Sequence, residues 1–239
     1  MLWVDLRFLS RNWLKTLATT LVAPVLYLLA FGYGLGRGVT VEGFSYLEFV
    51  IPGIIALTAM TTSFNAAGMK LHVDRLFYKC FDEALMSPVS FFAIIVGKTL
   101  IGVVRGLFST AALLAACFVF SPLPAVSALF WLTLVGTCFV FSFLGVLVAL
   151  IAKSHQDMSV FMSLVILPMS FLSGTFFSLS QVPEALQIVL SFSPLTHTSL
   201  CLRASALGQP FPWVSLGVLL GFGAIFFGLC FVALRRTSL

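Results

Sequence analysis

The chain has 239 residues, of which 60% are hydrophobic and only 9% are charged, and its mean hydropathy is +1.13. Because soluble globular domains carry about 25% charged residues, this composition excludes a soluble protein and indicates an integral membrane protein. A chain of this length accommodates one membrane domain and leaves no room for a soluble catalytic domain beside it. The net charge of +5 is explained by membrane orientation, so we expect no nucleic-acid partner.

The sequence contains no motif for a metal site, a disulfide framework or a nucleotide-binding site. The cysteines occur singly and far apart, at Cys80, Cys117, Cys138, Cys201 and Cys230. Without a CxxC pair or a histidine at metal-ligand spacing, they predict neither a disulfide framework nor a metal site. No GxxxxGK[ST] phosphate-binding loop is present, so we expect no catalytic residues and no cofactor in this chain.

The chain begins with an amphipathic stretch, about residues 2–15. Leu2, Leu6, Leu9 and Trp13 recur there at helical spacing. This pattern predicts a helix that lies in the membrane interface. A simple polar lead-in to the first span is the alternative.

Six apolar runs follow, each long enough to cross a bilayer as a helix, which takes about 20 residues. They run roughly from Leu17 to Leu35, Phe49 to Met69, Phe91 to Phe120, Val126 to Ala152, Met158 to Leu179 and Trp213 to Leu234. The third run exceeds what a bilayer requires, so its first part, with Lys98, is expected at or below the interface. We therefore predict an all-α polytopic membrane protein whose residues 1–239 form a single transmembrane domain.

The basic residues of the connections orient these spans. With both termini in the cytoplasm, only Arg37 and Arg203 of the 13 Lys and Arg residues fall outside. The remainder lie in cytoplasmic connections or, for Lys98 and Arg105, in the first part of the third span. Because cytoplasmic loops carry an excess of Lys and Arg, this asymmetry predicts cytoplasmic termini and places the segment 180–212 outside.

The segment 70–90 concentrates charge in an otherwise apolar chain. Its charged side chains are Lys70, Asp74, Arg75, Lys79, Asp82 and Glu83. The orientation places this segment in the cytoplasm, where aromatic residues among the charges favour a surface on which another protein docks. An ordinary solvated loop, whose charges only orient the chain, is the alternative.

The acidic residues argue against a proton-driven carrier. All eight carboxylates are expected in connections or at span edges, namely Asp5, Glu42, Glu48, Asp74, Asp82, Glu83, Asp157 and Glu184. The three histidines, His72, His155 and His197, are also assigned to connections. Proton-coupled transporters usually carry a titratable group inside the membrane, so active transport by this chain requires an outside source of energy.

Polar residues inside two predicted spans are candidates for a translocation path or a dimer seam. Thr58, Thr61, Thr62 and Asn65 make the second span polar in its second half. Lys98 and Arg105 share one face of the third span, being close to two helical turns apart, and Arg105 is placed to meet an anionic headgroup or a sugar phosphate. The alternatives are local packing for the hydroxyls, and for Arg105 snorkelling or pairing with Asp82 or Glu83.

Several short motifs in a fixed order resemble those of ABC-2 type transporter permeases over nearly the whole chain. FGYGLG ends the first span at Phe31 to Gly36, and Pro52-Gly53 opens the second. Leu85-Met86-Ser87-Pro88-Val89-Ser90 precedes the third, with Gly97-Lys98 after it, and Ser173-Gly174-Thr175-Phe176-Phe177 and Ser193-Pro194-Leu195-Thr196-His197 come late in the chain. FGYGLG followed by Ser45 to Gly53 resembles above all the nodulation lipo-oligosaccharide exporter permeases.

The resemblance implies an assembly and a cellular location. Two permease subunits, as a homodimer or a close heterodimer, pair in a bacterial cytoplasmic (inner) membrane. Two separate ABC ATPase subunits bind ATP and Mg, so the permease itself is not an enzyme. The substrate class implied is an amphipathic or lipid-linked molecule, such as a lipo-oligosaccharide, polysaccharide, lipid or drug, that is exported.

The resemblance also implies roles for individual residues. The cytoplasmic link between spans two and three contains a coupling helix, which falls on residues 70–86, with the expected contact residues Arg75, Phe77, Tyr78, Phe81, Asp82, Glu83 and Leu85. An external re-entrant segment with short helices at Pro183 to Leu190 and Pro194 to Leu207 contains Gly174, Pro183, Pro194, His197 and Arg203. An ATP-independent carrier or facilitator is the alternative function.

Overall fold

The computed structural model describes residues 7, 10–35, 40–41, 43–79, 81, 86, 89–120, 127–178 and 183–237. Of the interfacial helix expected at residues 2–15, the described residues 7, 10–11 and 13–15 are helical, and residues 2–6 and 8–9 lie outside this part of the chain. Of the expected coupling residues, Asp82, Glu83 and Leu85 also lie outside it.

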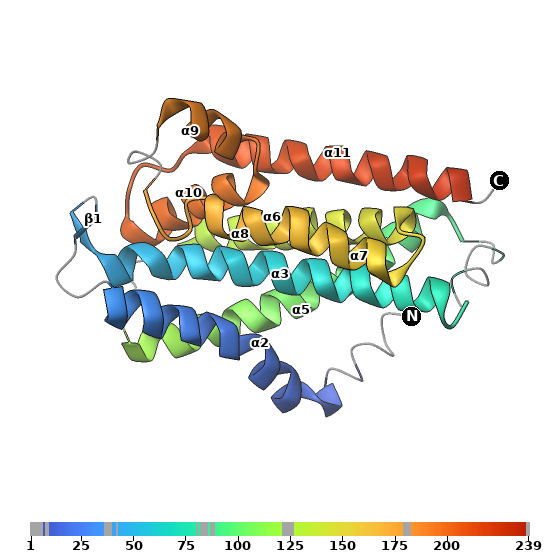
Figure 1. The fold of residues 1–239 in the computed structure, drawn as a ribbon, viewed down its shortest axis with the longest axis horizontal. Coiled ribbons are helices and arrows are strands. Elements are labelled where there is room, and N and C mark those ends of the chain that lie inside the picture. The colour runs from blue at the N-terminus through green and yellow to red at the C-terminus, as the bar shows by residue number, and fades with distance from the viewer. Residues whose placement is uncertain are drawn as a thin grey trace.

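The described chain is almost entirely helical (Figure 1). It begins with α2 (Trp13–Tyr27), which continues as the π-helical η1 (Leu28–Leu35). Two short antiparallel strands, β1 (Thr40–Val41) and β2 (Phe44–Ser45), form a hairpin that we did not expect. The remaining elements are, in order, α3 (Tyr46–Leu76), α5 (Phe91–Phe120), α6 (Ala128–Ile151), α7 (His155–Phe161), η2 (Met162–Ile166), α8 (Leu167–Leu172), α9 (Glu184–Ser191), α10 (Pro194–Leu207) and α11 (Trp213–Thr237).

The fold confirms an all-α polytopic membrane protein. Five single helices of the described chain are long and apolar enough to cross a membrane, or six if the bent pair α9 and α10 counts as one span. The expected fifth span appears as α7, η2 and α8, which follow one another without a gap. Pro168 explains the wide turn of η2, since proline lacks an N–H and crowds the carbonyl four residues earlier.

The second span is longer than expected and changes the position of the charged segment. We predicted its end at Met69, but α3 continues to Leu76. Lys70, Asp74 and Arg75 therefore belong to the last two turns of a helix, and the expected loop begins only after them. Asp74 is buried there, which corrects the assignment of this carboxylate to a connection.

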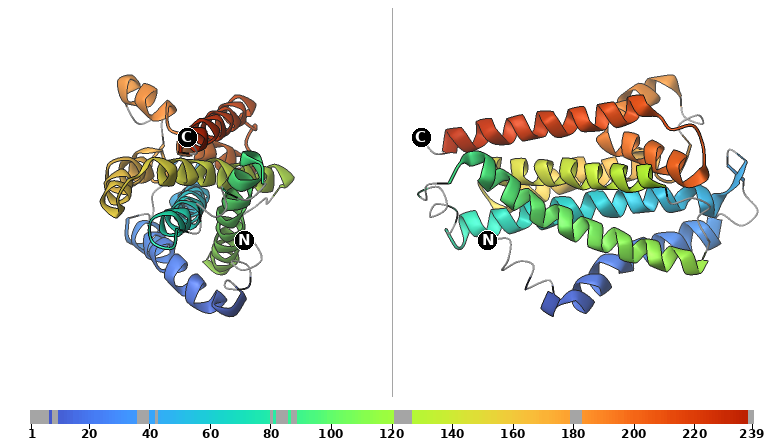
Figure 2. Two further views of the ribbon diagram at one scale, coloured as in Figure 1. Left: turned by 90° about the vertical axis from the view of Figure 1, so that its right-hand side faces the viewer. Right: turned by 180° about the vertical axis from the view of Figure 1, so that it is seen from behind.

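Helix α3 lies at the centre of the bundle, with α2, α5 and α6 around it, as the end-on view in Figure 2 shows. Small residues permit this packing. A Cβ added to Gly145 of α6 would lie 2.5 Å from the carbonyl oxygen of Phe64, so only glycine allows the two backbones to approach so closely. Close helix contacts through small residues are a main source of association within membranes.

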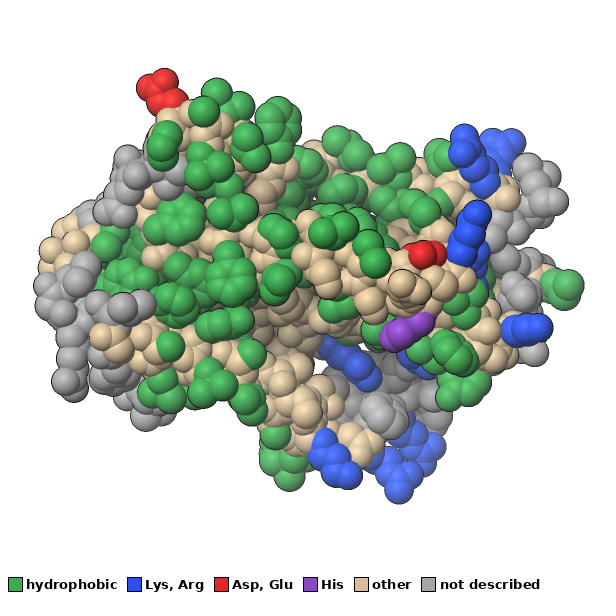
Figure 3. Space-filling model, in the orientation of Figure 1, with side chains coloured by type: hydrophobic (Ala, Val, Ile, Leu, Met, Phe, Trp, Pro, Cys, Tyr) green, Lys and Arg blue, Asp and Glu red, His purple; other side chains and the backbone are tan. Residues whose placement is uncertain are grey.

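The bundle has two chemically different ends. The last turns of α3 with residues 77–79 after them, the turn between α6 and α7 and the last turn of α11 lie together at one end, the basic end (Figure 1), and blue side chains gather there in Figure 3. These segments carry Lys70, Arg75, Lys79, Lys153, Arg235 and Arg236. The hairpin β1–β2 and helix α9 lie at the other, the hairpin end (Figure 1). Green apolar side chains cover much of the surface between them in Figure 3, as expected of a face in contact with lipid.

The close approach of α3 and α6 can be tested with one added methyl group. Gly145→Ala should lower the free energy of unfolding by about 1–3 kcal/mol, because the methyl has no room against the Phe64 carbonyl. Gly217→Ala in α11 is the matched control, since nothing lies within 4 Å of its added Cβ. Denaturation of both variants in detergent measures the difference, and equal stability would contradict the packing.

Candidate functional site

A cavity of about 690 Å³ lies between α2, α3, α5, η2 and α8. This is within the size range of ligand pockets, about 300–1,000 Å³. Its lining residues are Thr16, Thr19, Thr20, Ala23, Pro24, Tyr27, Leu57, Thr58, Thr61, Thr62, Asn65, Ala66, Met69, Arg105, Met162, Ser163, Ile166, Leu167 and Ser170. Five of the six residues that we assigned to a path or dimer seam are therefore brought together here.

Hydroxyl side chains from two helices form facing walls of this cavity. On α3, Thr58 donates to the carbonyl of Ile54 at 2.8 Å, and Thr61 donates to that of Leu57 at 2.9 Å. On α2, Thr20 donates in the same way to the carbonyl of Thr16 at 2.7 Å. These bonds satisfy the hydroxyl protons within each helix and leave oxygen lone pairs available to the cavity.

Arg105 of α5 is the only charged side chain among the residues that line the cavity. Its Nε is buried without a hydrogen-bond partner. No carboxylate in the described part of the chain forms an ion pair with its guanidinium. The cavity thus combines a row of hydroxyl oxygens with one cation.

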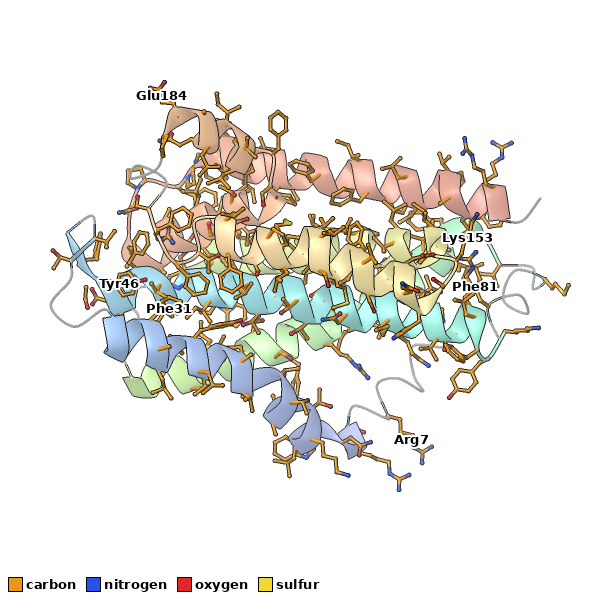
Figure 4. All side chains as sticks on the ribbon, viewed as in Figure 1. Arg7, Phe31, Tyr46, Phe81, Lys153 and Glu184 are labelled. Carbon is orange, nitrogen blue, oxygen red and sulfur yellow. The ribbon has the colours of Figure 1, made fainter. Side chains whose placement is uncertain are left out.

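Aromatic side chains gather where the cavity approaches the hairpin end. Tyr27 lines the cavity and packs against Phe176, with the ring centroids 5.7 Å apart. Phe31 stacks on the same ring at 4.5 Å, and Tyr46 donates its hydroxyl to the carbonyl of Phe176 at 2.9 Å. Figure 4 shows Phe31 and Tyr46 close together at this end. The cluster forms an apolar closure beyond the polar walls.

The expected re-entrant segment is organised around a buried arginine. Helices α9 and α10 meet at 96°, and Pro194 begins α10. Arg203 of α10 donates to the carbonyls of Phe49 and Gly174, and its guanidinium lies 3.6 Å from the Phe49 ring centre. It therefore joins α10, the start of α3 and the turn after α8.

The remaining residues of this segment occupy turns. Gly174 has φ = +70°, a conformation that favours glycine. The Nε2 of His197 lies 2.8 Å from the carbonyl oxygen of Ser191, which links α10 to the end of α9. Pro183 precedes the first residue of α9. None of these residues lines the cavity.

Lys98 does not line the cavity, in contrast to its expected place on the path. Its Nζ lies 2.6 Å from Oδ2 of Asp74, and Lys70 approaches the other carboxylate oxygen at 2.9 Å. The Lys98 side chain is only 6% exposed. Asp74 therefore joins α3 to α5 through a buried ion pair at the basic end.

Arg75 lies beside this ion pair and bonds to the end of α6. Its guanidinium donates to the carbonyls of Ala149, Leu150 and Ala152. These carbonyls belong to the last turn of α6 and to Ala152, which follows it, where backbone acceptors lack partners within the helix. Arg75, expected as a contact for an ATPase subunit, thus connects α3 to α6 inside this chain.

The expected coupling segment presents two of its aromatic residues to solvent. Phe77 and Tyr78, which follow α3 directly, are each 69% exposed. Phe81 differs from the expectation, because it is 1% exposed and packs among Leu71, Ile95 and Leu234. In this conformation Phe81 anchors the segment to the bundle, and Figure 4 shows it at the basic end.

The turn from α6 to α7 at the basic end has its own cap. The Lys153 and Ser154 N–H groups both donate to the Asp157 carboxylate, at 2.9 and 3.1 Å. These hydrogen bonds hold the pKa of Asp157 below its usual value, because they favour the ionised form. In the described part of the chain, no group of three or more His, Cys, Asp or Glu residues is arranged to hold a metal ion.

Three residues of the cavity were missed at the sequence level. Thr16, Thr19 and Thr20 of α2 line the wall that faces α3. Their spacing places them on one helical face, so the pattern was present in the sequence. We assigned no role to these three threonines.

Fold and cavity together define a polytopic helical membrane protein built around a polar hollow. The chain belongs to the ABC-2 type transporter family, since the model of that family matches residues 1–207. It is 32% identical to the inner membrane transport permease YadH of Escherichia coli K12, over 95% of this chain and 90% of the relative. It is 31% identical to nodulation protein J of Rhizobium leguminosarum bv. viciae, over 86% and 80%, and 29% identical to that of Rhizobium meliloti, over 93% and 87%.

The two lysines that contact Asp74 are predicted to contribute very differently to the free energy of unfolding, because only the pair with Lys98 is buried. Asp74→Asn leaves the Lys98 ammonium buried without a counter-ion and should lower the free energy of unfolding by about 3–5 kcal/mol. Lys98→Met in the same chain should recover most of that loss. Lys70→Met is the matched control, and its effect should stay below about 1 kcal/mol because the Lys70 side chain is 40% exposed.

Unfolding in detergent, arranged as a double-mutant cycle, measures these differences. An Asp74→Asn variant that loses less stability than Lys70→Met would show that the buried pair is not the contact that joins α3 to α5.

Proposed function

We propose that this chain is the membrane-spanning permease half of an ATP-driven ABC exporter. The observation that carries the proposal is the hydroxyl-lined cavity between α2, α3 and α8, inside a chain of the ABC-2 family. A polar hollow within an apolar bundle is costly unless a substrate or water occupies it. The cavity is accordingly the part of this chain that a substrate crosses.

A second permease subunit completes the path in this proposal. Apolar side chains of α2, η2 and α8 next to the cavity are exposed, among them Val22, Leu26, Leu164 and Leu167. Two such faces, brought together as a homodimer or a close heterodimer, enclose the two cavities between them. The aromatic cluster around Phe176 then closes the path at the hairpin end.

Two ABC ATPase subunits bind at the basic end and supply the energy. The exposed Phe77 and Tyr78 are the contact residues that the described structure supports best, with Asp82, Glu83 and Leu85 beyond it in the same segment. Arg75 and the Asp74–Lys98 pair connect this end to α6 and α5, so a push there moves three helices together. ATP and Mg belong to the ATPase subunits.

The same proposal includes location and substrate class. The E. coli relative is described as an inner membrane transport permease, and we place this chain in a bacterial inner membrane. The basic end, which carries Arg235 and Arg236, faces the cytoplasm, as do both termini, because cationic connections stay on that side. The substrate is amphipathic or lipid-linked, in keeping with a cavity that has polar walls and apolar surroundings.

The contact between permease and ATPase can be tested by removing the two exposed aromatic side chains. A chain with Phe77→Ser and Tyr78→Ser should retain its fold and lose most of the ABC ATPase that co-purifies with the unaltered chain from gentle detergent. Truncating central aromatic anchors typically costs an interface about 2 kcal/mol or more each, roughly a thirtyfold loss of affinity. Mass spectrometry of the co-purified material gives the measurement.

Phe192→Ser is the matched control, because Phe192 is also an exposed aromatic residue, 74% exposed, at the opposite end. It should leave the co-purification unchanged. The proposal fails if no ABC ATPase accompanies the unaltered chain and the purified permease alone transports substrate in vesicles, which is the behaviour of a facilitator.

A further inference from the structure

We infer that the cavity binds an anionic amphiphile whose headgroup also carries hydroxyl donors, with Arg105 as the counter-ion of the anionic group. The inference rests on the proposed function and gives it a substrate class. It follows from three features of the cavity: one cation that has no partner among the described residues, a wall of hydrogen-bond acceptors, and an apolar remainder.

The first feature is the position and isolation of Arg105. At 1.5 Å per residue it lies about 21 Å along α5 from Phe91, close to the middle of a membrane-crossing helix. A guanidinium stays protonated at any physiological pH, so burial cannot neutralise it. A cation at such depth is costly without a counter-ion, and the carboxylates of the described chain provide none for it.

The contrast with Lys98 makes this isolation informative. Lys98, on the same helix, is neutralised by Asp74 at 2.6 Å. Among the described residues, a carboxylate therefore neutralises the cation that joins two helices, and none neutralises the cation that faces the cavity. A phosphate group suits Arg105 because a guanidinium binds its oxygens in a bidentate manner.

The second feature is the direction of the threonine hydrogen bonds. Because Thr58 and Thr61 donate their protons to carbonyls of their own helix, their oxygens offer only lone pairs to a ligand. A ligand that satisfies them must carry donors, such as the hydroxyls of a glycerol or sugar headgroup. A phosphate monoester without hydroxyls would satisfy Arg105 and leave this wall unused.

The third feature is the apolar part of the lining. Leu57, Met69, Met162 and Ile166 stand beside the polar walls. They provide a surface for the acyl or prenyl chain of an amphiphile, which a free inorganic anion would not use. The cavity thus suits an amphiphile, which has a polar headgroup and an apolar chain, better than it suits a free ion.

Binding of defined short-chain lipids to the purified chain in neutral maltoside micelles tests the inference. The probes are dihexanoyl phosphatidylglycerol, which is anionic with glycerol hydroxyls; dihexanoyl phosphatidylcholine, which is zwitterionic; dihexanoyl phosphatidic acid, which lacks the hydroxyls; and inorganic phosphate. Calorimetric titration gives each Kd. Phosphatidylglycerol should bind at least about tenfold more tightly than phosphatidylcholine, because choline has no hydroxyl donor for the threonine wall and brings a second cation close to Arg105.

Two variants separate the two polar features. Arg105→Gln should weaken the binding of phosphatidylglycerol and of phosphatidic acid about tenfold or more, because both use the guanidinium as counter-ion of their phosphate. Thr61→Val, which keeps the side-chain shape, should weaken phosphatidylglycerol binding several-fold and leave phosphatidic acid binding unchanged. Arg236→Gln is the matched control, since it removes one exposed arginine outside the cavity and should change none of the values.

The inference is overturned if Arg105→Gln binds phosphatidylglycerol as tightly as the unaltered chain, if Arg236→Gln weakens it equally, or if inorganic phosphate binds as tightly as the lipid. Loss of ATPase co-purification would instead refute the proposed function, and none of these titrations depends on the ATPase. The two failures are therefore distinguishable.

Discussion

The central position of α3 is the constraint on which the rest of the structure depends. One side of this helix packs on α5 and α6 so closely that Gly145 admits no side chain against the Phe64 carbonyl. That contact leaves the opposite side, with Thr58, Thr61 and Asn65, to face the cavity. Since a helix has a fixed period, close packing on one face determines which residues the other face presents.

The two ends of α3 are held by different chemistry. At the basic end, Asp74 pairs with Lys98 and the guanidinium of Arg75 bonds to the end of α6. At the hairpin end, Arg203 bonds to the backbone of Phe49 and lies against its ring. Both arrangements give hydrogen-bond or ion-pair partners to polar groups for which lipid offers none. They therefore fix the helix against its neighbours. Arg105 has no such arrangement among the described residues, which distinguishes it from the structural cations.

Hydropathy was sufficient to predict the helical fold and located α5 to the residue, while the family resemblance located α9 and α10 to within one residue at each end. Hydropathy failed where polar residues face the protein interior. The run that contains Lys70, His72, Asp74 and Arg75 resembles a loop in composition, although His72 and Asp74 are buried in a helix. Composition cannot predict such burial, because the partners that make it favourable, Lys98 above all, come from another helix. The burial of Phe81 was unpredictable for the same reason, since its pocket is built by Leu71, Ile95 and Leu234.

The cavity was predictable only in part, because one of its walls is evident within a single span and the other is not. The polar row of α3 is evident within one span, whereas Thr16, Thr19 and Thr20 gain meaning only when α2 is placed opposite that row. In the proposed transport cycle this arrangement has a mechanical consequence. A push on Phe77 and Tyr78 acts on one continuous helix whose other end, Phe49, is held by Arg203. The threonine wall of α3 lies between these two points, so it must tilt against α2 as the basic end moves. Such a movement changes the distance between the two hydroxyl walls. It therefore also changes how strongly they bind a headgroup that lies between them.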